Sequence, residues 1–365
     1  MEIKKWLKDI PDYVPGRTLE EIKSKYNLEQ VYKLASNENM EGPSQEVVEA
    51  ICQAASRVNY YPDANCTRLR EELSKVLKVG KDNLVVGNGT DQIIEMLCDC
   101  FVGNGDNIVI ADPTFLIYEK ASLKCGCRVK KIPLIEYRQD IQGMVSAMNS
   151  HTKILFLTSP HNPTGSNISR EDFEYALTEA SSQTLVVIDE AYFEYVPEQL
   201  RLDSVSYLDR FPNLVVLRTF SKIFGLAGLR VGYGVANENI ISSMNKIRLP
   251  FNVNSLGQAA AIAALRNWES ISSVRERVDK EKNKFYKRLG QNKIRYIESC
   301  ANFLLIETGS QTSQIIEDLL GKGFIVRPGY NLGVDGYLRV TISVPDINDK
   351  FLDQFIKIYK KYNNQ

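Results

Sequence analysis

The residues best suited to covalent chemistry lie just after an apolar run that ends at Leu217. Lys222 stands between Phe220 and Phe224, among apolar and small residues. Desolvation at such a position lowers the pKa of a lysine, so its amine becomes available for a Schiff base with a carbonyl compound. Arg230 follows eight residues later and can present its guanidinium fork to a phosphate in the same pocket.

A second group of candidates follows the run Leu84 to Val86, in the sequence Gly87-Asn88-Gly89-Thr90-Asp91. Glycine lets the backbone approach an anion closely, and the free amides at a helix start point toward it. The segment is a candidate phosphate site. Taken alone, it is explained better as a plain strand-to-helix turn with Thr90 or Asp91 as the N-cap.

Asn162 lies between two prolines after the run Ile154 to Leu157, in Ser159-Pro160-His161-Asn162-Pro163. The prolines fix the backbone, so the amide could be held at a sheet edge to bind a ligand; a rigid turn is the alternative. His161 has no nucleophile near it in the sequence. We expect it to support the site rather than to act in catalysis.

Asp189 directly follows the run Leu185 to Ile188, and Tyr192 comes three residues later. An acid at the end of a buried strand is costly to ionise unless a cation meets it. Walker B strands of phosphate-loop NTPases share this pattern, but the chain has no G-x-x-x-x-G-K-[ST] loop. The NTPase interpretation is therefore excluded.

Together these strand-end groups are an anion cradle, an amide, a carboxylate, a tyrosine, a lysine and an arginine. Pyridoxal 5'-phosphate (PLP) needs such a set: a lysine for the imine, an acid for the pyridine nitrogen, donors to the ring oxygen and a phosphate cup. The sequence therefore predicts a PLP site and no metal site.

The elements that must position these groups form a series of short apolar runs whose starts are ~15 to 30 residues apart, which leaves room for crossover helices. Such spacing predicts an α/β domain with a mostly parallel seven-stranded sheet, which binds ligands at the carboxyl ends of its strands. The runs are Leu84 to Val86, Ile108 to Ala111, Val129 to Ile132, Ile154 to Leu157, Leu185 to Ile188, Leu214 to Leu217 and Val231 to Val235.

The pattern changes after about Pro250, where a helical section over Ser255 to Leu289 begins. Short strand-like pieces and a final helix from about Asn348 then predict a smaller α+β domain; the pieces are Phe303 to Glu307, Gly323 to Arg327 and Tyr337 to Ser343. The first 36 residues contain a helix candidate over Leu19 to Tyr26 and no strand-like run. We expect a large cofactor domain over 37–250, with 1–36 and 251–365 forming an N-terminal arm and the small domain.

Composition excludes several other classes of function. The 365 residues carry 45 Lys+Arg and 45 Asp+Glu. This balance gives no net positive electrostatic field that would attract a nucleic-acid backbone or an anionic membrane. The seven cysteines show no C-x-x-C spacing, and no apolar run is long enough for a signal peptide or a membrane span. These features predict reduced thiols in the cytoplasm.

With these motifs the chain resembles the fold-type I PLP-dependent aminotransferases, and within them most closely the histidinol-phosphate aminotransferases. The resemblance covers nearly the whole chain and keeps the order of the family's motifs. Those motifs are YVPGR (13–17), KLASNENMEGPS (33–44), YPD (61–63), GNGTDQ (87–92), PTF-x-x-Y (113–118), SPHNPTG (159–165), VVIDEAY (186–192), RTFSKxxGLAGLRxGY (218–233), VRP (326–328) and LRVTIS (338–343).

The resemblance implies an aspartate aminotransferase-like fold and a role for each matching residue. Lys222 would form the imine and move the proton, Asp189 would pair with the pyridine nitrogen, and Tyr192 would donate to the ring oxygen. The implied cofactor-binding residues are Gly89, Thr90, Asp91, Phe115, Asn162, Asp189, Tyr192, Ser221, Lys222 and Arg230. The implied substrate-binding residues are Tyr13, Asn37, Tyr61, Arg327 and Arg339.

The resemblance also implies a homodimer with shared active sites, because Tyr61 reaches the neighbouring subunit's site in relatives. The implied reaction exchanges an amino group between L-histidinol phosphate and 2-oxoglutarate, as in histidine biosynthesis. Three positions depart from the usual family pattern near the substrate pocket: His161, Tyr60 and Ser343. Transamination of aromatic amino acids and decarboxylation of an amino acid phosphate therefore stay open as alternatives.

Overall fold

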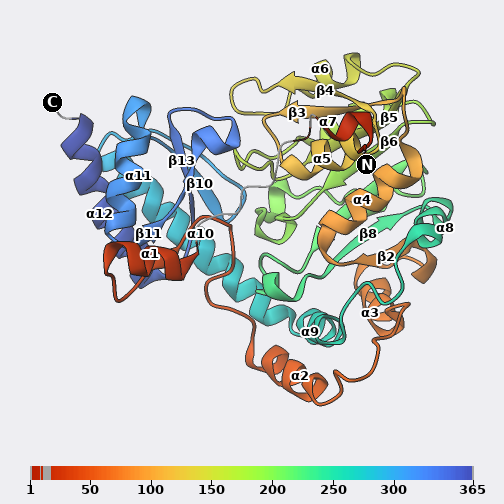
Figure 1. Cartoon of the computed structure of the whole chain (residues 1–365), viewed down its shortest axis with the longest axis horizontal. Coiled ribbons are helices and arrows are strands. Elements are labelled where there is room, and N and C mark those ends of the chain that lie inside the picture. The colour runs from red at the N-terminus through yellow and green to blue at the C-terminus, as the bar shows by residue number, and fades with distance from the viewer. Residues whose placement is uncertain (1, 9, 11–17, 364–365) are drawn as a thin grey trace.

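The computed structural model describes residues 2–8, 10 and 18–363, which form a large and a small α/β lobe (Figure 1). The large lobe holds a seven-stranded sheet in the order β2-β8-β7-β6-β5-β3-β4. Its strands are β2 (Leu84–Gly87), β3 (Asn107–Asp112), β4 (Arg128–Pro133), β5 (Thr152–Thr158), β6 (Leu185–Asp189), β7 (Leu214–Thr219) and β8 (Gly232–Ala236). Six of the predicted runs lie within these strands, and the seventh, Val231 to Val235, begins one residue before β8. The predicted α/β sheet of seven strands is confirmed.

All neighbouring strands in this sheet are parallel except at β8, which is antiparallel to both β2 and β7. The segment between β7 and β8 contains only a 3-10 turn at Ala227–Leu229, too short for a crossover helix, so the chain returns antiparallel. The sheet is therefore mostly parallel, as predicted. The parallel strands end at the same edge, where the candidate groups stand.

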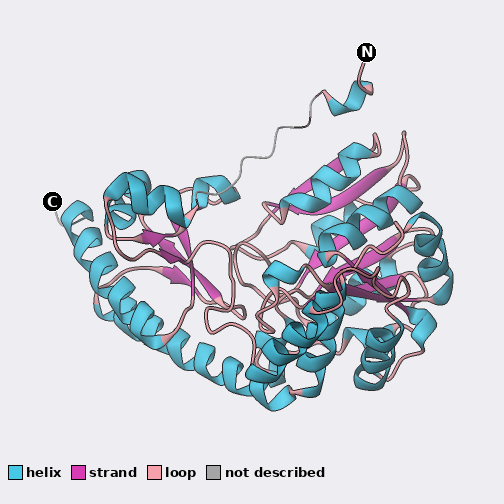
Figure 2. Ribbon diagram, turned by 60° about the horizontal axis from the view of Figure 1, so that its bottom comes forward, coloured by secondary structure: helices cyan, strands magenta, loops and turns pink. Residues whose placement is uncertain are grey.

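Helices cover both faces of the large sheet (Figure 2), and alternate residues of one strand pack on opposite sides. In β5, Leu155 and Leu157 belong to one apolar cluster, whereas Ile154 and Phe156 belong to the other. The second cluster includes residues of α4 (Gly89–Phe101), α5 (Leu116–Lys124) and α8 (Glu238–Ile247). The first includes residues of α3 (Thr67–Leu77), α6 (Ile141–Ser146), α7 (Arg170–Glu179) and α9 (Ser255–Arg266).

The small lobe contains a four-stranded antiparallel sheet in the order β12-β13-β10-β9. Its strands are β9 (Tyr296–Ile297), β10 (Phe303–Glu307), β12 (Arg327–Pro328) and β13 (Tyr337–Thr341). A second, two-stranded sheet pairs β1 (Tyr32–Lys33) in parallel with β11 (Phe324–Ile325). The helices around these sheets are α1 (Leu19–Tyr26), α10 (Trp268–Gln291), α11 (Thr312–Gly321) and α12 (Pro345–Asn363).

Three details differ from the sequence predictions. The first 36 residues do contain a strand, β1, which has only two residues and therefore shows no periodicity in the sequence. The piece Gly323 to Arg327 is split between two sheets. The long helical section is broken at Asn267, whose side chain caps α10 by accepting from the Ser270 amide.

The helix α9 packs against α3 and α2 (Gln45–Ala55), which belong to the segment expected to form the large domain, and α10 then runs toward α11 and α12 (Figure 1). The domain division at residues 36 and 250 stays a prediction.

The remaining short helices are 3-10 turns at Lys5–Leu7, Lys81–Asn83, Phe193–Tyr195, Glu198–Leu200, Ser204–Tyr207, Gly309–Gln311 and Gly329–Leu332. Among the described helices, none combines the length and the apolar character that a membrane crossing requires.

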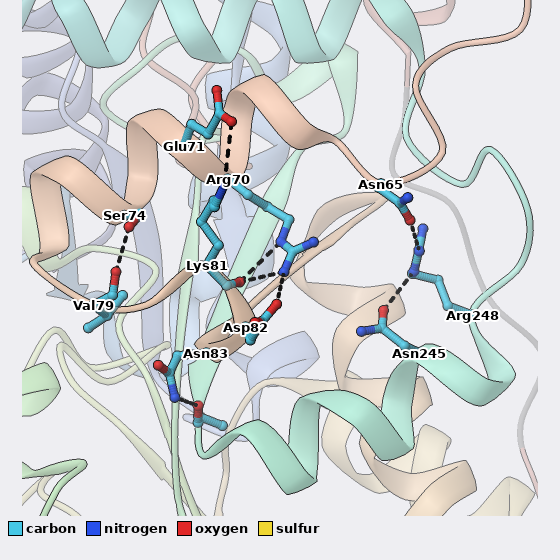
Figure 3. A network of polar contacts seen from close by, with 11 residues as sticks. Asn65, Arg70, Glu71, Ser74, Val79, Lys81, Asp82, Asn83, Asn245 and Arg248 are labelled. Carbon is cyan, nitrogen blue, oxygen red and sulfur yellow. Dashed lines mark hydrogen bonds and ion pairs between the residues drawn. The ribbon is translucent and has the colours of Figure 1, made fainter.

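A polar network fixes the segments on either side of α3 (Figure 3). Arg70 of α3 donates to the carbonyl of Lys81 and to the carboxylate of Asp82, which ties the helix to the residues leading into β2. Arg248 donates to the side chain of Asn65 at 3.2 Å and so holds the loop before α3. That loop follows Tyr61, one of the predicted substrate-binding residues.

Candidate active site

A cavity of about 540 Å³ lies at the carboxyl ends of the parallel strands, where the small lobe meets the large sheet. It brings together most of the predicted site residues from eight separate segments of the chain. Those lining the cavity are Asn37, Thr90, Asp91, Phe115, Asn162, Asp189, Tyr192, Ser221, Lys222, Arg230, Arg327 and Arg339.

Three predicted residues stand apart from this lining. Gly89 lies behind Arg230 at the start of α4. Tyr61 is 81% exposed and stacks on Phe251, with 4.4 Å between ring centroids, so it does not reach this subunit's cavity. Tyr13 lies outside the described residues.

Asp189 ends β6 with its carboxylate buried at the base of the cavity. Tyr118 donates to it from its hydroxyl at 2.7 Å, and the backbone amide of Ala191 donates at 3.0 Å. Burial raises the pKa of Asp189 to about 6, although both donors favour the charged form. Two neutral donors do not replace a counter-ion, so this carboxylate is suited to a cationic ligand group.

Lys222 presents its amine on the same side of the sheet. It follows β7 by three residues, and the buried side chains of Phe220 and Ile223 hold its backbone in the core. Its Nζ donates to the carbonyl of Ser36 at 3.1 Å and lies 5.5 Å from the ring centroid of Tyr192. Among the residues that the structure describes, no carboxylate forms a salt bridge with this amine.

Tyr192 and Asn162 each have a hydrogen-bond donor group left for a ligand. The amide of Asn37, which has a left-handed backbone at φ 59°, donates to the Tyr192 hydroxyl oxygen at 2.9 Å. The hydroxyl hydrogen of Tyr192 is therefore not used in that bond. Arg339 donates to the amide oxygen of Asn162, which leaves the Asn162 NH2 group toward the cavity.

An anion cradle forms where α4 begins. Gly89 has φ +75°, and a Cβ added there would lie 2.5 Å from Nη2 of Arg230. Arg230 donates to the Ser221 hydroxyl at 3.3 Å and to the Asp91 carboxylate at 3.1 Å. Backbone amides at the start of a 13-residue helix, a guanidinium and a hydroxyl thus converge, which is the donor set that binds phosphate.

Two arginines from the small lobe also line the cavity. Arg327 of β12 and Arg339 of β13 are register partners on neighbouring strands. Arg339 is buried and donates to the carbonyl of Ala35 at 2.8 Å, while its Nε has no hydrogen-bond partner among the described residues. Burial, together with repulsion from Arg327, lowers the pKa of Arg339 to about 10. This uncompensated positive charge favours an anionic substrate group.

Tyr118 is a site residue that the sequence interpretation did not assign. It lies on the first turn of α5, stacks on Phe156 at 4.7 Å and packs edge-to-face against Phe115 at 5.7 Å. The motif PTF-x-x-Y contained the signal, because three residues after Phe115 is one helical turn and so the same face. His161, in contrast, is fully buried outside the cavity lining, and burial lowers its pKa to about 3, in keeping with a supporting role.

Comparison with known proteins places the chain in one family. Residues 29–357 match the family described as aminotransferase class I and II. A histidinol-phosphate aminotransferase of Moorella thermoacetica is 41% identical over 344 residues, which is 94% of this chain and 89% of that protein. Another, from Carboxydothermus hydrogenoformans, is 39% identical over 96% of this chain and 98% of its own length.

Solved structures show the same fold. The histidinol-phosphate aminotransferase of Sinorhizobium meliloti, in complex with pyridoxal-5'-phosphate, superimposes with a TM-score of 0.90 over 98% of both chains at 24% identity. The enzyme of Clostridium acetobutylicum gives a TM-score of 0.83 at 26% identity, over 91% of this chain and all of its own. The chain belongs to the aminotransferase class I and II family.

Proposed function

We propose that the protein is a PLP-dependent aminotransferase that exchanges the amino group between L-histidinol phosphate and 2-oxoglutarate. The observation that carries this proposal is the placement of the Lys222 amine, the buried Asp189 carboxylate and the Arg327–Arg339 pair around one cavity. The relatives that are 38–41% identical and bear the name histidinol-phosphate aminotransferase support the choice of substrate.

The residues of the cavity fit PLP. Its phosphate suits the cradle of Gly89, Thr90, Ser221 and Arg230, because a side chain at position 89 would close the approach to the Arg230 guanidinium. Its protonated pyridine nitrogen would supply the cation that Asp189 lacks. Asn162 and Tyr192 would donate to the ring oxygen, and Phe115 lines the wall that would face the ring.

When bound, PLP supplies an electron-poor ring that accepts the electron pair of the substrate α-carbon. Lys222 would take the α-proton on its Nζ and return it at the other reacting carbon, since general bases act within hydrogen-bond reach. Ionised Asp189 would keep the ring nitrogen protonated and so keep the ring electron-poor. Each of these roles uses a side chain that already lines the cavity.

Arg339 and Arg327 would hold the anionic groups of the substrates, which are two carboxylates in glutamate and one phosphate in histidinol phosphate. Planar guanidinium forks bind carboxylate and phosphate with the same geometry, so one pair can serve both glutamate and histidinol phosphate. Asn162 accepts from Arg339, which would orient the fork toward the reacting carbon.

An exposed apolar surface in the segments 60–65 and 248–251, which are joined by the Tyr61–Phe251 stack, supports a homodimer with shared sites. Tyr60, Tyr61 and Leu249 are 70%, 81% and 67% exposed, and Arg248 holds the neighbouring loop through Asn65. Large apolar side chains presented on an ordered surface favour a self-complementary contact. We infer that Tyr61 reaches the substrate site of the second subunit.

Two measurements test the proposed function. Purified enzyme would be assayed with 2-oxoglutarate and histidinol phosphate beside tyrosine, phenylalanine and phosphothreonine; turnover of another donor but not of histidinol phosphate would overturn the substrate. Borohydride reduction should fix the cofactor on a peptide containing Lys222, and Lys222→Ala should lose that labelled peptide. A label retained in Lys222→Ala would overturn the lysine assignment.

A further inference from the structure

One face of β13 carries the small lobe's contacts with the rest of the site. Tyr337, Arg339 and Thr341 alternate along the strand and therefore point to the same side. Leu338 and Val340 point to the other side, where both are fully buried in the small-lobe core. The position of Arg339 is thus tied to the two side chains that flank it on its own face.

Together these three side chains contact three other segments of the chain. Thr341 accepts from the backbone amide of Asn37 at 3.0 Å, and Arg339 donates to the amide oxygen of Asn162. The Tyr337 hydroxyl lies 2.9 Å from the hydroxyl of Tyr137, and their rings pack edge-to-face at 5.4 Å. Tyr137 belongs to the loop after β4, so the outermost contact also joins the small lobe to the large one.

The loop that carries Tyr137 is a tight turn with an unfavourable backbone. Ile135 and Arg138 exchange two backbone hydrogen bonds of 2.9 Å, and the two residues between them have φ values of 47° (Glu136) and 62° (Tyr137). Such turns favour glycine or asparagine, because a Cβ is strained in the left-handed region. Strained backbone that persists in a folded protein is typical of sites where function requires it.

The turn is fixed to the strand that delivers Asn162. Gln139 follows the turn directly. Its side-chain NH2 group donates to the backbone carbonyl of Thr158 at 2.7 Å, and its side-chain oxygen accepts from the backbone amide of Thr158 at 3.1 Å. Thr158 ends β5, four residues before Asn162. A continuous series of contacts therefore connects Thr158, through Tyr137, Tyr337 and Arg339, with Asn162 on the same segment.

We propose that the Tyr137–Tyr337 contact is a positioning contact for substrate binding, which holds β13 so that the Arg339 guanidinium stays aligned beside Asn162. The inference rests on the proposed role of Arg339 in binding a substrate carboxylate. Neither tyrosine lines the cavity, so both act through Arg339 rather than on the substrate.

The test measures how tightly the PLP-loaded enzyme binds succinate, an unreactive dicarboxylate, and how the Michaelis constant for the oxo-acid acceptor changes. Tyr337→Phe and Tyr137→Phe should each weaken succinate binding and raise that Michaelis constant by about three- to tenfold, with kcat within about twofold. The double variant should be no worse than either single one, because both remove the same hydrogen bond. Unchanged succinate affinity, or additive losses in the double variant, would overturn the proposal.

A glycine pair separates this role from ordinary stabilisation. Tyr137→Gly relieves the backbone strain but loses the contact, so its melting temperature should be maintained or raised while succinate affinity falls. Glu136→Gly relieves the neighbouring strain with Tyr137 in place, and its succinate affinity should match the wild type. A loss of affinity in both glycine variants would show that the turn backbone, and not the tyrosine, matters.

The outcome is independent of which amino donor the enzyme uses. Succinate affinity reports the Arg339 geometry even if histidinol phosphate is not turned over. If Arg339→Lys leaves succinate binding unchanged, then the proposed role of Arg339 fails first. If Arg339→Lys weakens succinate binding but the tyrosine variants leave it unchanged, the proposed positioning contact is wrong and the proposed function is not affected.

Discussion

The hydroxyl of Tyr118 donates a 2.7 Å hydrogen bond to the carboxylate of Asp189, and both side chains are buried at the carboxyl end of the large sheet. Thr158 lies 3.2 Å from the same hydroxyl. Because the Tyr118 hydrogen is committed to Asp189, Thr158 acts as the donor to Tyr118. The carboxylate that would pair with the cofactor is therefore oriented by two successive hydrogen bonds, from Thr158 at the end of β5 to Tyr118 and from Tyr118 to Asp189.

Tyr118→Phe should weaken cofactor binding and shift its pH dependence. The lost hydrogen bond favoured the ionised carboxylate, so the pKa of Asp189 in the cofactor-free protein should rise above about 6. Cofactor affinity, which depends on ionised Asp189 in the proposed function, should then begin to fall at a higher pH than in the wild type. Titration of the apoprotein with PLP from pH 5 to 8 measures this shift.

Tyr207→Phe is the matched control, because it also removes a hydroxyl that donates to a carboxylate, that of Glu174, outside the cavity lining. Its pH dependence should follow the wild type. An unshifted profile in Tyr118→Phe would show that Tyr118 is only a packing residue.

Asp189→Asn should stabilise the cofactor-free protein at high pH while it impairs cofactor binding. Folding raises the pKa of Asp189 from 3.8 to about 6, so the folded state holds the proton more tightly and stability is lost as the pH rises through 6. The cost above that pH is about 3 kcal/mol, at roughly 1.4 kcal/mol per pKa unit. The asparagine side chain of the variant is uncharged at every pH, so the variant does not lose this stability.

Melting temperatures of the two apoproteins from pH 4 to 8 provide the measurement. The variant should match the wild type near pH 4 and exceed it near pH 8, whereas saturating PLP should reverse the order at pH 8. A difference in melting temperature between the two apoproteins that does not vary with pH would show that ionisation of Asp189 is not its cause.

Gly89→Ala should weaken the binding of PLP by tenfold or more, at about 1.4 kcal/mol per tenfold. The added methyl group would lie 2.5 Å from Arg230 Nη2, which must move away from the phosphate cradle. Gly105→Ala is the control, because Gly105 also has a positive φ, +94°, but has nothing within 4 Å of its Cβ position. Equal losses of PLP affinity in both variants would assign the effect to backbone strain rather than to the Arg230 contact.

Mixing two inactive variants should restore activity if the active sites are shared between subunits. Tyr61→Ala lacks the proposed contribution to the partner's site, and Lys222→Ala lacks the amine of its own. After subunit exchange in an equal mixture, half of the dimers are hybrids with one complete site each, so about a quarter of the wild-type activity should return. Failure of the mixture to gain activity would place Tyr61 outside the neighbouring site.

The sequence by itself determined the large sheet and the chemistry at its edge. Runs such as Leu185 to Ile188 are continuously apolar because both faces of a parallel sheet are buried, and that pattern is visible without any partner. The residues following those runs, Asn162, Asp189 and Lys222, share the cavity because the carboxyl ends of parallel strands meet at one edge.

Only the tertiary structure decided the contacts that join distant segments. The strand β1 has two residues and exists because Tyr32 pairs with Phe324, nearly 300 residues away. Tyr118 meets Asp189, and Tyr137 meets Tyr337, across elements whose relative placement no local pattern encodes. Side-chain chemistry and periodicity are local properties of a chain, whereas the distance between two side chains depends on how all the elements pack together.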